Sequence, residues 1–119
     1  MIIVAATLDF ADQEARDAVV AACAPVQLAT RFDEPGCQAY CFAADPCVPN
    51  RIQVHECWDD EASLVAHFKH QNYADMVTVL RTQGITAAWN QMYLVARNEP
   101  VYSPTGAPRE KFFVDEPQS

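Results

Sequence analysis

The sequence predicts an α+β domain with the ferredoxin-like order β-α-β-β-α-β. Three observations lead to this fold class. Short segments rich in β-forming residues occur at residues 2–8, 37–43, 51–58 and 86–96. Stretches with helical periodicity separate the first two segments and the last two. The proline-rich connection 45–50 joins the middle pair as a hairpin, which completes the order.

The first helix is expected directly after the first strand. Asp9 and Asp12 are candidate N-caps, because a short acidic side chain there accepts a hydrogen bond from the first helical turn. Apolar residues from Val19 to Ala29 then recur at spacings of three and four, which is typical of one buried helix face. The Pro-Gly pair at 35–36 ends the helix.

Alternation divides the middle strands into two faces. In the second strand, Tyr40 and Phe42 share one face, and Cys37, Ala39 and Cys41 share the other. The third strand has one face made of Ile52, Val54, Glu56 and Trp58, and another made of Gln53, His55 and Cys57.

The last helical stretch is expected in two pieces. Acidic residues at 59–61 begin the first piece, where the helix dipole favours negative charge. The second piece runs over about 73–81 and ends before Gly84.

Composition excludes several classes of partner. The 119 residues carry sixteen acidic and eight basic side chains, a formal net charge of −8. A surface this acidic repels phosphate backbones and anionic lipids, so we expect no nucleic-acid and no membrane partner. The N-terminal residues lack the basic start of a signal peptide, and five cysteines are an odd number. We therefore expect a cytoplasmic protein with reduced thiols and no metal site.

The chain divides into a folded domain, residues 1–98, and a proline-rich C-terminal arm, residues 99–119. Four of the eight prolines fall in the arm, together with the apolar cluster at 112–114. Adjacent phenylalanines favour packing of the arm on its own subunit or on a partner, and plain disorder is the alternative. A four-stranded sheet with helices on one side also leaves an apolar face open. The sequence therefore predicts a homodimer that covers this face.

Two motifs resemble the antibiotic biosynthesis monooxygenase (ABM) domain. The first is the run 30–36, Thr-Arg-x-x-Glu-Pro-Gly, which is followed by Cys37. The second is the run 56–61, Glu-x-Trp-Asp-Asp-Glu, with His67 on the helix after it. The resemblance covers roughly residues 1–98 and implies a dimeric α+β barrel. Some members of this family oxidise quinols or polycyclic phenols with O2 and without a bound cofactor.

The resemblance also implies a set of site residues. His67 would be the catalytic base or proton shuttle, and Asn72 would hydrogen-bond an oxygen of the substrate. Trp58 would be a wall of the substrate site, and Tyr73 would present its hydroxyl there. Glu56 lies on an otherwise apolar strand face, so it is either a base with a raised pKa or the partner of Arg31 or Arg51.

Each of these residues also has a structural interpretation. His67 could simply be a hydrogen-bonded interface histidine, and Trp58 could anchor a helix on the sheet. The alternative function is a non-catalytic dimeric module that binds a small aromatic metabolite. An exposed, unpaired His67 beside an apolar cavity would favour the enzyme, and a cavity filled by Phe68, Met76 and the arm would favour the module. Haem degradation is less compatible with the position of His67.

No cofactor is expected. With three glycines in the chain, the sequence contains no dinucleotide-binding motif, phosphate-binding loop or nucleophile elbow.

Overall fold

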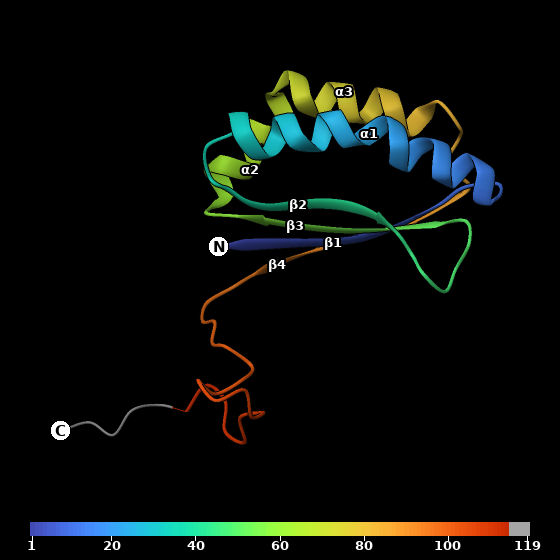
Figure 1. Ribbon diagram of the computed structural model, residues 1–119. Helices are drawn as coiled ribbons and strands as arrows, with labels where there is room; N and C mark the ends of the chain where they lie inside the picture. The colour runs from blue at the N-terminus through green and yellow to red at the C-terminus, as the bar shows by residue number, and fades with distance from the viewer. Residues whose placement is uncertain (115–119) are drawn as a thin grey trace.

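A computed structural model describes residues 1–114 and confirms the ferredoxin-like fold. The elements are β1 (Ile2–Asp9), α1 (Gln13–Asp33), β2 (Cys37–Ala44), β3 (Arg51–Trp58), α2 (Glu61–Lys69), α3 (Gln71–Arg81) and β4 (Ala87–Leu94). The strands form one antiparallel sheet in the order β2-β3-β1-β4. All three helices lie on one face of it (Figure 1). Residues 115–119 of the expected arm lie outside the described residues.

Acidic caps start the first two helices. Asp12 accepts a hydrogen bond from the backbone N–H of Ala15 at 2.8 Å, and Asp60 accepts one from Ser63 at 2.8 Å. Each bond satisfies one of the backbone donors that a helix N-terminus leaves free. Asp9, the other candidate cap, instead lies in β1 and forms a salt bridge with Arg51.

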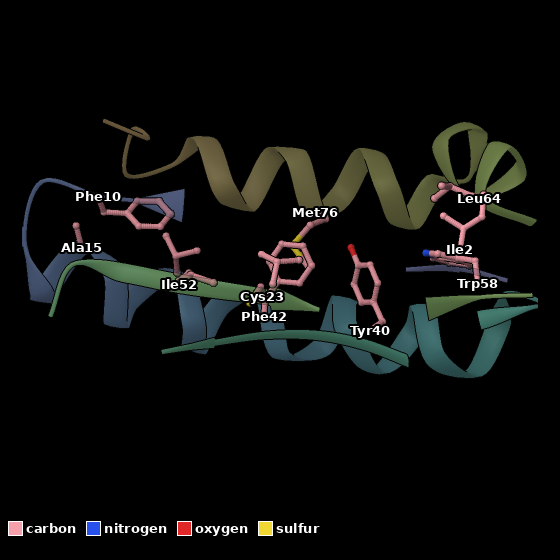
Figure 2. Packing of buried hydrophobic residues seen from close by; sticks show 12 residues of the cluster. Ile2, Phe10, Ala15, Cys23, Tyr40, Phe42, Ile52, Trp58, Leu64 and Met76 are labelled. Atoms are coloured by element: carbon pink, nitrogen blue, oxygen red, sulfur yellow. The ribbon is translucent and has the colours of Figure 1, made fainter. Parts of the chain in front are cut away.

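The core is a single layer between the sheet and the helices. Figure 2 shows it running from Phe10 and Ala15 at one end, past Met76, to Leu64 and Trp58 at the other. Phe10 and Trp58 have no exposed surface. Burying a large apolar side chain of this kind stabilises the fold by about 1.5–3 kcal/mol.

A β-bulge corrects one predicted face of β2. Cys37 pairs with Trp58, whereas Ala39 pairs with Cys57, so Gln38 is an additional residue in the strand. The extra residue breaks the alternation. Cys37 therefore packs against the core, and only Ala39 and Cys41 keep the predicted outward face.

The helices cover the sheet unevenly. α1 packs mainly on β2, and α2 packs on β3, while no helix packs extensively on β4. β4 is exposed along its whole length and is an edge of the sheet. The half of the helix-side face formed by β1 and β4 therefore lies open.

Candidate functional site

A buried polar cluster joins the end of α1 to α2 and α3. Glu34, the C-cap residue of α1, accepts a hydrogen bond from the Asn72 side-chain amide at 3.2 Å. Its other carboxylate oxygen lies 2.7 Å from Nδ1 of His67. The Glu34 and His67 side chains are 4% and 2% exposed. Removing one member of a pair this deeply buried would leave the other without a partner, which is strongly destabilising.

Aromatic rings surround His67. Its ring centroid lies 4.6 Å from that of Trp58, 5.4 Å from that of Tyr40 and 5.5 Å from that of Tyr73. This packing and the Glu34 contact together fix the orientation of the imidazole. Nε2, the second ring nitrogen, has no hydrogen-bond partner among residues 1–114.

Glu56 is a second buried carboxyl, on the helix side of β3. The Trp58 indole N–H donates a hydrogen bond to it at 3.0 Å. Burial raises the pKa of Glu56, while the Trp58 hydrogen bond and the nearby His67 act in the opposite direction. The predicted salt bridge of Glu56 is wrong, because Arg31 bonds the Tyr40 carbonyl and Arg51 pairs with Asp9.

An open cavity of about 350 Å³ lies where the helices leave the sheet uncovered. Its lining is mostly apolar and comes from all four strands, α2 and α3. The polar residues in the lining are Glu56, Tyr73, Asn90 and Gln91. A concave apolar site with a few polar groups is typical of small-molecule binding.

The sequence-predicted site residues fall into two shells around this cavity. Glu56 and Tyr73 line it directly. Trp58, His67 and Asn72 are buried behind them and are not part of its lining. His67 is therefore neither exposed nor unpaired. The arm and Met76 do not fill the cavity, although Phe68 lines it.

Sequence reasoning missed two residues. In the sequence, Glu34 stands out only as part of the family-like run 30–36. A glutamate at a helix end beside a proline and a glycine is usually exposed, so its burial was not expected. Asn90 gave no signal, because one asparagine in a β-rich segment looks like an exposed strand residue.

The described chain shows neither a metal centre nor a membrane span. Within residues 1–114, no three His, Cys, Asp or Glu side chains come together as metal ligands would. In the same range, no helix combines the length and hydropathy that crossing a bilayer requires.

The fold and the cavity define a small ferredoxin-like protein with a concave, mostly apolar site of the kind that binds small molecules. The sequence model of one family, described as antibiotic biosynthesis monooxygenase, matches residues 1–79. The chain belongs to this family. A search of curated proteins found no match.

Solved structures of the same family share the fold. A protein from Deinococcus radiodurans assigned to these monooxygenases has a TM-score of 0.70 at 22% identity, covering 87% of this chain and 100% of that one. A counterpart from Caulobacter crescentus CB15 has a TM-score of 0.72 at 16% identity, covering 81% and 90%. A further antibiotic biosynthesis monooxygenase structure is 26% identical with a TM-score of 0.68, covering 82% and 100%.

Proposed function

We propose that the protein binds a small phenol or quinol in the open cavity and oxidises it with O2, without a cofactor of its own. The observation that carries this proposal is Glu56, a buried carboxyl in the lining of an otherwise largely apolar cavity. A carboxyl whose pKa is raised by burial above its ordinary value is a stronger base and suits the removal of a phenolic proton. The family membership supports the same type of reaction.

The proposed reaction uses the substrate as its own reductant. Glu56 accepts the phenolic proton, and the electron-rich phenolate transfers electrons to O2. One oxygen atom bonds to a ring carbon and the other leaves as water, so a quinol and O2 give a hydroxyquinone and water. The apolar lining excludes bulk water from the phenolate and the peroxy group.

The polar groups of the cavity favour an elongated substrate. Glu56 pairs with Val4 on β1, and Val4 pairs with Met92, two residues beyond Asn90 on β4. The Cα atoms of Glu56 and Asn90 are therefore about 12 Å apart, since neighbouring strands are about 4.8 Å apart and residues rise about 3.4 Å. A two-ring or three-ring aromatic with an oxygen at each end suits this spacing.

His67 and Asn72 act from behind the cavity wall in this proposal. The imidazole lowers the pKa of Glu56, although less than burial raises it. Asn72 and Glu34 hold the imidazole in place. Tyr73 presents its ring to the substrate, while Trp58 packs against His67 and orients Glu56 through its indole N–H.

Oxygen uptake by the chelator-treated protein tests the proposal. A panel of quinols and polycyclic phenols is supplied, and spontaneous autoxidation is subtracted. Glu56→Gln is expected to reduce the enzymatic rate at least about 100-fold, because general-base catalysis contributes about 10²–10⁴-fold. Glu14→Gln, on the exposed first turn of α1, is the matched control and should leave the rate unchanged.

The pH profile adds a second readout. The base acts when deprotonated, so the rate should rise with pH through the raised pKa of Glu56. His67→Gln removes a group that lowers this pKa, so the acidic limb should move to higher pH. Uptake that survives Glu56→Gln with an unchanged profile would rule out Glu56 as the base.

The second candidate function is a module that binds a small aromatic metabolite without catalysis. The burial and pairing of His67 favour it, because a structural histidine has the same contacts. Binding of 2-naphthol without any oxygen uptake above autoxidation would support the module.

The same proposal includes a homodimer formed through the sheet face that the helices leave free. Trp89 and Tyr93 on this face are 50% and 48% exposed. All five cysteines are unpaired, which suits the reducing environment of a cytoplasm.

A further inference from the structure

A second hollow continues the cavity along α2. It has a volume of about 200 Å³ and is lined by Ile2, Glu61, Leu64, Val65, Phe68 and Met92. Leu64, Phe68 and Met92 also line the main cavity, so the two hollows adjoin. Figure 2 shows Ile2 and Leu64 together at this end of the core. We call this second hollow the groove, and the reaction proposed above makes no use of it.

The lining of the groove suits an aliphatic group. Five of its six residues are apolar, and Glu61 is the one that is not. Val65 and Phe68 are each 48% exposed, and Met92 is 57% exposed. An aliphatic chain that lies between them removes apolar surface of both partners from water. A sugar or another polar substituent would lose its water there without gaining hydrogen-bond donors.

The groove begins opposite the proposed base. Glu56 pairs with Val4 on β1, and Val4 pairs with Met92 on β4, so the three residues lie on one line across the sheet. All three line the main cavity. The Cα atoms of Glu56 and Met92 are about 10 Å apart, because neighbouring strands are about 4.8 Å apart. A ring with its hydroxyl at Glu56 therefore places its opposite edge beside Met92, at the entrance of the groove.

The groove leads away from the other polar end of the cavity. Asn90 precedes Met92 by two residues on β4, and the groove continues from Met92 toward Ile2 and Glu61. A second ring oxygen at Asn90 and a substituent at Met92 would thus point in different directions. Phe68 and Glu61 are seven residues apart on α2. The groove therefore runs about 10 Å along the helix, roughly the length of an extended chain of eight carbons.

The far end of the groove is negatively charged. Glu61 is exposed in the first turn of α2 and lies in the lining. Asp60 comes directly before it, and hydrogen bonds from Ser63 lower its pKa, with a smaller contribution from the Met1 α-amino group. Among the described residues, no Lys or Arg lines either hollow. A chain that ended in a carboxylate would therefore be repelled.

We propose that the ligand carries an uncharged aliphatic chain of up to about eight carbons, that the groove binds this chain, and that Glu61 excludes chains ending in an anion. The substrate is then a phenol or quinol with an aliphatic substituent on the edge opposite the reacting hydroxyl. This inference rests on the proposed function for the position of the ring. Binding of the chain is nevertheless measured without turnover.

A series of 6-alkyl-2-naphthols tests the chain. Their binding to the full-length protein is followed by the fluorescence of the naphthol, with chains of two to twelve carbons. The dissociation constant is expected to fall roughly 2-fold per methylene, because a half-buried methylene gains about half of the free energy of full burial. The fall should stop at about eight carbons, where the groove ends.

Substitution of Val65 tests the location. Val65 lines the groove but not the main cavity. Val65→Ser is expected to weaken binding of 6-hexyl-2-naphthol at least about 3-fold, because an apolar wall is lost. Binding of 2-naphthol, which has no chain, should not change. Leu28→Ser, at a 55% exposed position of α1, is the matched control and should alter neither affinity. Circular dichroism checks that both variants are folded.

A charged chain tests Glu61. 6-(5-Carboxypentyl)-2-naphthol is expected to bind at least about 10-fold more weakly than the hexyl compound, because its carboxylate loses water and meets like charge. Glu61→Gln should recover at least about 3-fold of this loss and leave the hexyl compound unaffected. Glu14→Gln, in the exposed first turn of α1, is the matched control and should recover nothing.

Other results would overturn the inference. Affinity that does not depend on chain length would show that the chain lies outside the protein or that another segment occupies the groove. Affinity that keeps rising to twelve carbons, or that is unchanged by Val65→Ser, would indicate non-specific partition.

Failure of the proposed oxidation is distinguishable from failure of the groove. Chain-dependent binding without oxygen uptake would keep the groove and reject the enzyme. Oxygen uptake with chain-independent binding would do the reverse. No binding of 2-naphthol or of any alkylated compound would reject both.

Discussion

Glu34 is the residue on which the buried polar cluster depends. Its two carboxylate oxygens bond His67 and Asn72 separately, so one side chain holds both residues. Glu34→Ala leaves two buried polar groups without a partner. We expect this change to lower the free energy of unfolding by about 3–5 kcal/mol, as for other broken buried pairs. Chemical denaturation measures it.

The adjacent Asp33 provides the control. It is exposed at the last position of α1, and Asp33→Ala should change the free energy of unfolding by no more than about 0.5 kcal/mol. A Glu34→Ala protein as stable as Asp33→Ala would mean that water enters the cluster freely.

At this scale the sequence predicts residue types better than contacts. The sequence predicts Glu56 on β3 and Tyr73 on α3 as site residues, and both line the cavity. The pairing of Glu34 with His67 was not, because it joins positions 33 residues apart through packing of α1, α2 and the sheet. Neither hydropathy nor residue spacing shows which buried carboxyl group pairs with the His67 imidazole.

Among the elements, the turn between α1 and β2 is the most constrained. Gly36 has a φ of 85°, and its carbonyl accepts the Asp59 backbone N–H at 2.9 Å. A Cβ added there would lie 2.6 Å from the Cβ of Ser63 on α2. The turn thus sets how closely α2 approaches the end of α1, and so where His67 meets Glu34.

Gly36→Ala therefore combines backbone strain with a steric clash. Gly84 also has a positive φ, 73°, but an added Cβ there meets nothing within 4 Å. We expect Gly84→Ala to cost about 1–2 kcal/mol from strain alone. Gly36→Ala should cost about 1–3 kcal/mol more, because overpacking adds to the strain. Equal losses in thermal and chemical denaturation would show that Ser63 moves aside without cost.

Periodicity predicts every helix and strand but not their irregularities. The bulge at Gln38 has no sequence signature, so the face of Cys37 was assigned wrongly. His70, between α2 and α3, caps α3 by accepting the Asn72 N–H at 3.0 Å. The error at Cys37 arises where tertiary packing outweighs local preference.

The whole molecule has a sheet with two unlike faces and a net charge of −8. The outward face carries Trp89 beside Thr7 and Tyr93 beside Ile3. An exposed apolar face of this kind is typical of a surface that associates with another one. Because two subunits of like charge repel each other, salt should strengthen their association by screening.

The proposed dimer should therefore depend on the outward face and not on exposed apolar residues elsewhere. Trp89→Ser, Tyr93→Ser removes the two large side chains that we place at the centre of the interface, where a few aromatic residues usually supply most of the binding energy. We expect the dissociation constant to rise at least about 100-fold, measured by analytical ultracentrifugation at two salt concentrations. Leu28→Ser, Phe32→Ser alters the exposed side of α1, where the two residues are 55% and 81% exposed, and should leave the dimer intact. If the α1 variant dissociated and the sheet variant did not, the subunits would associate through their helices.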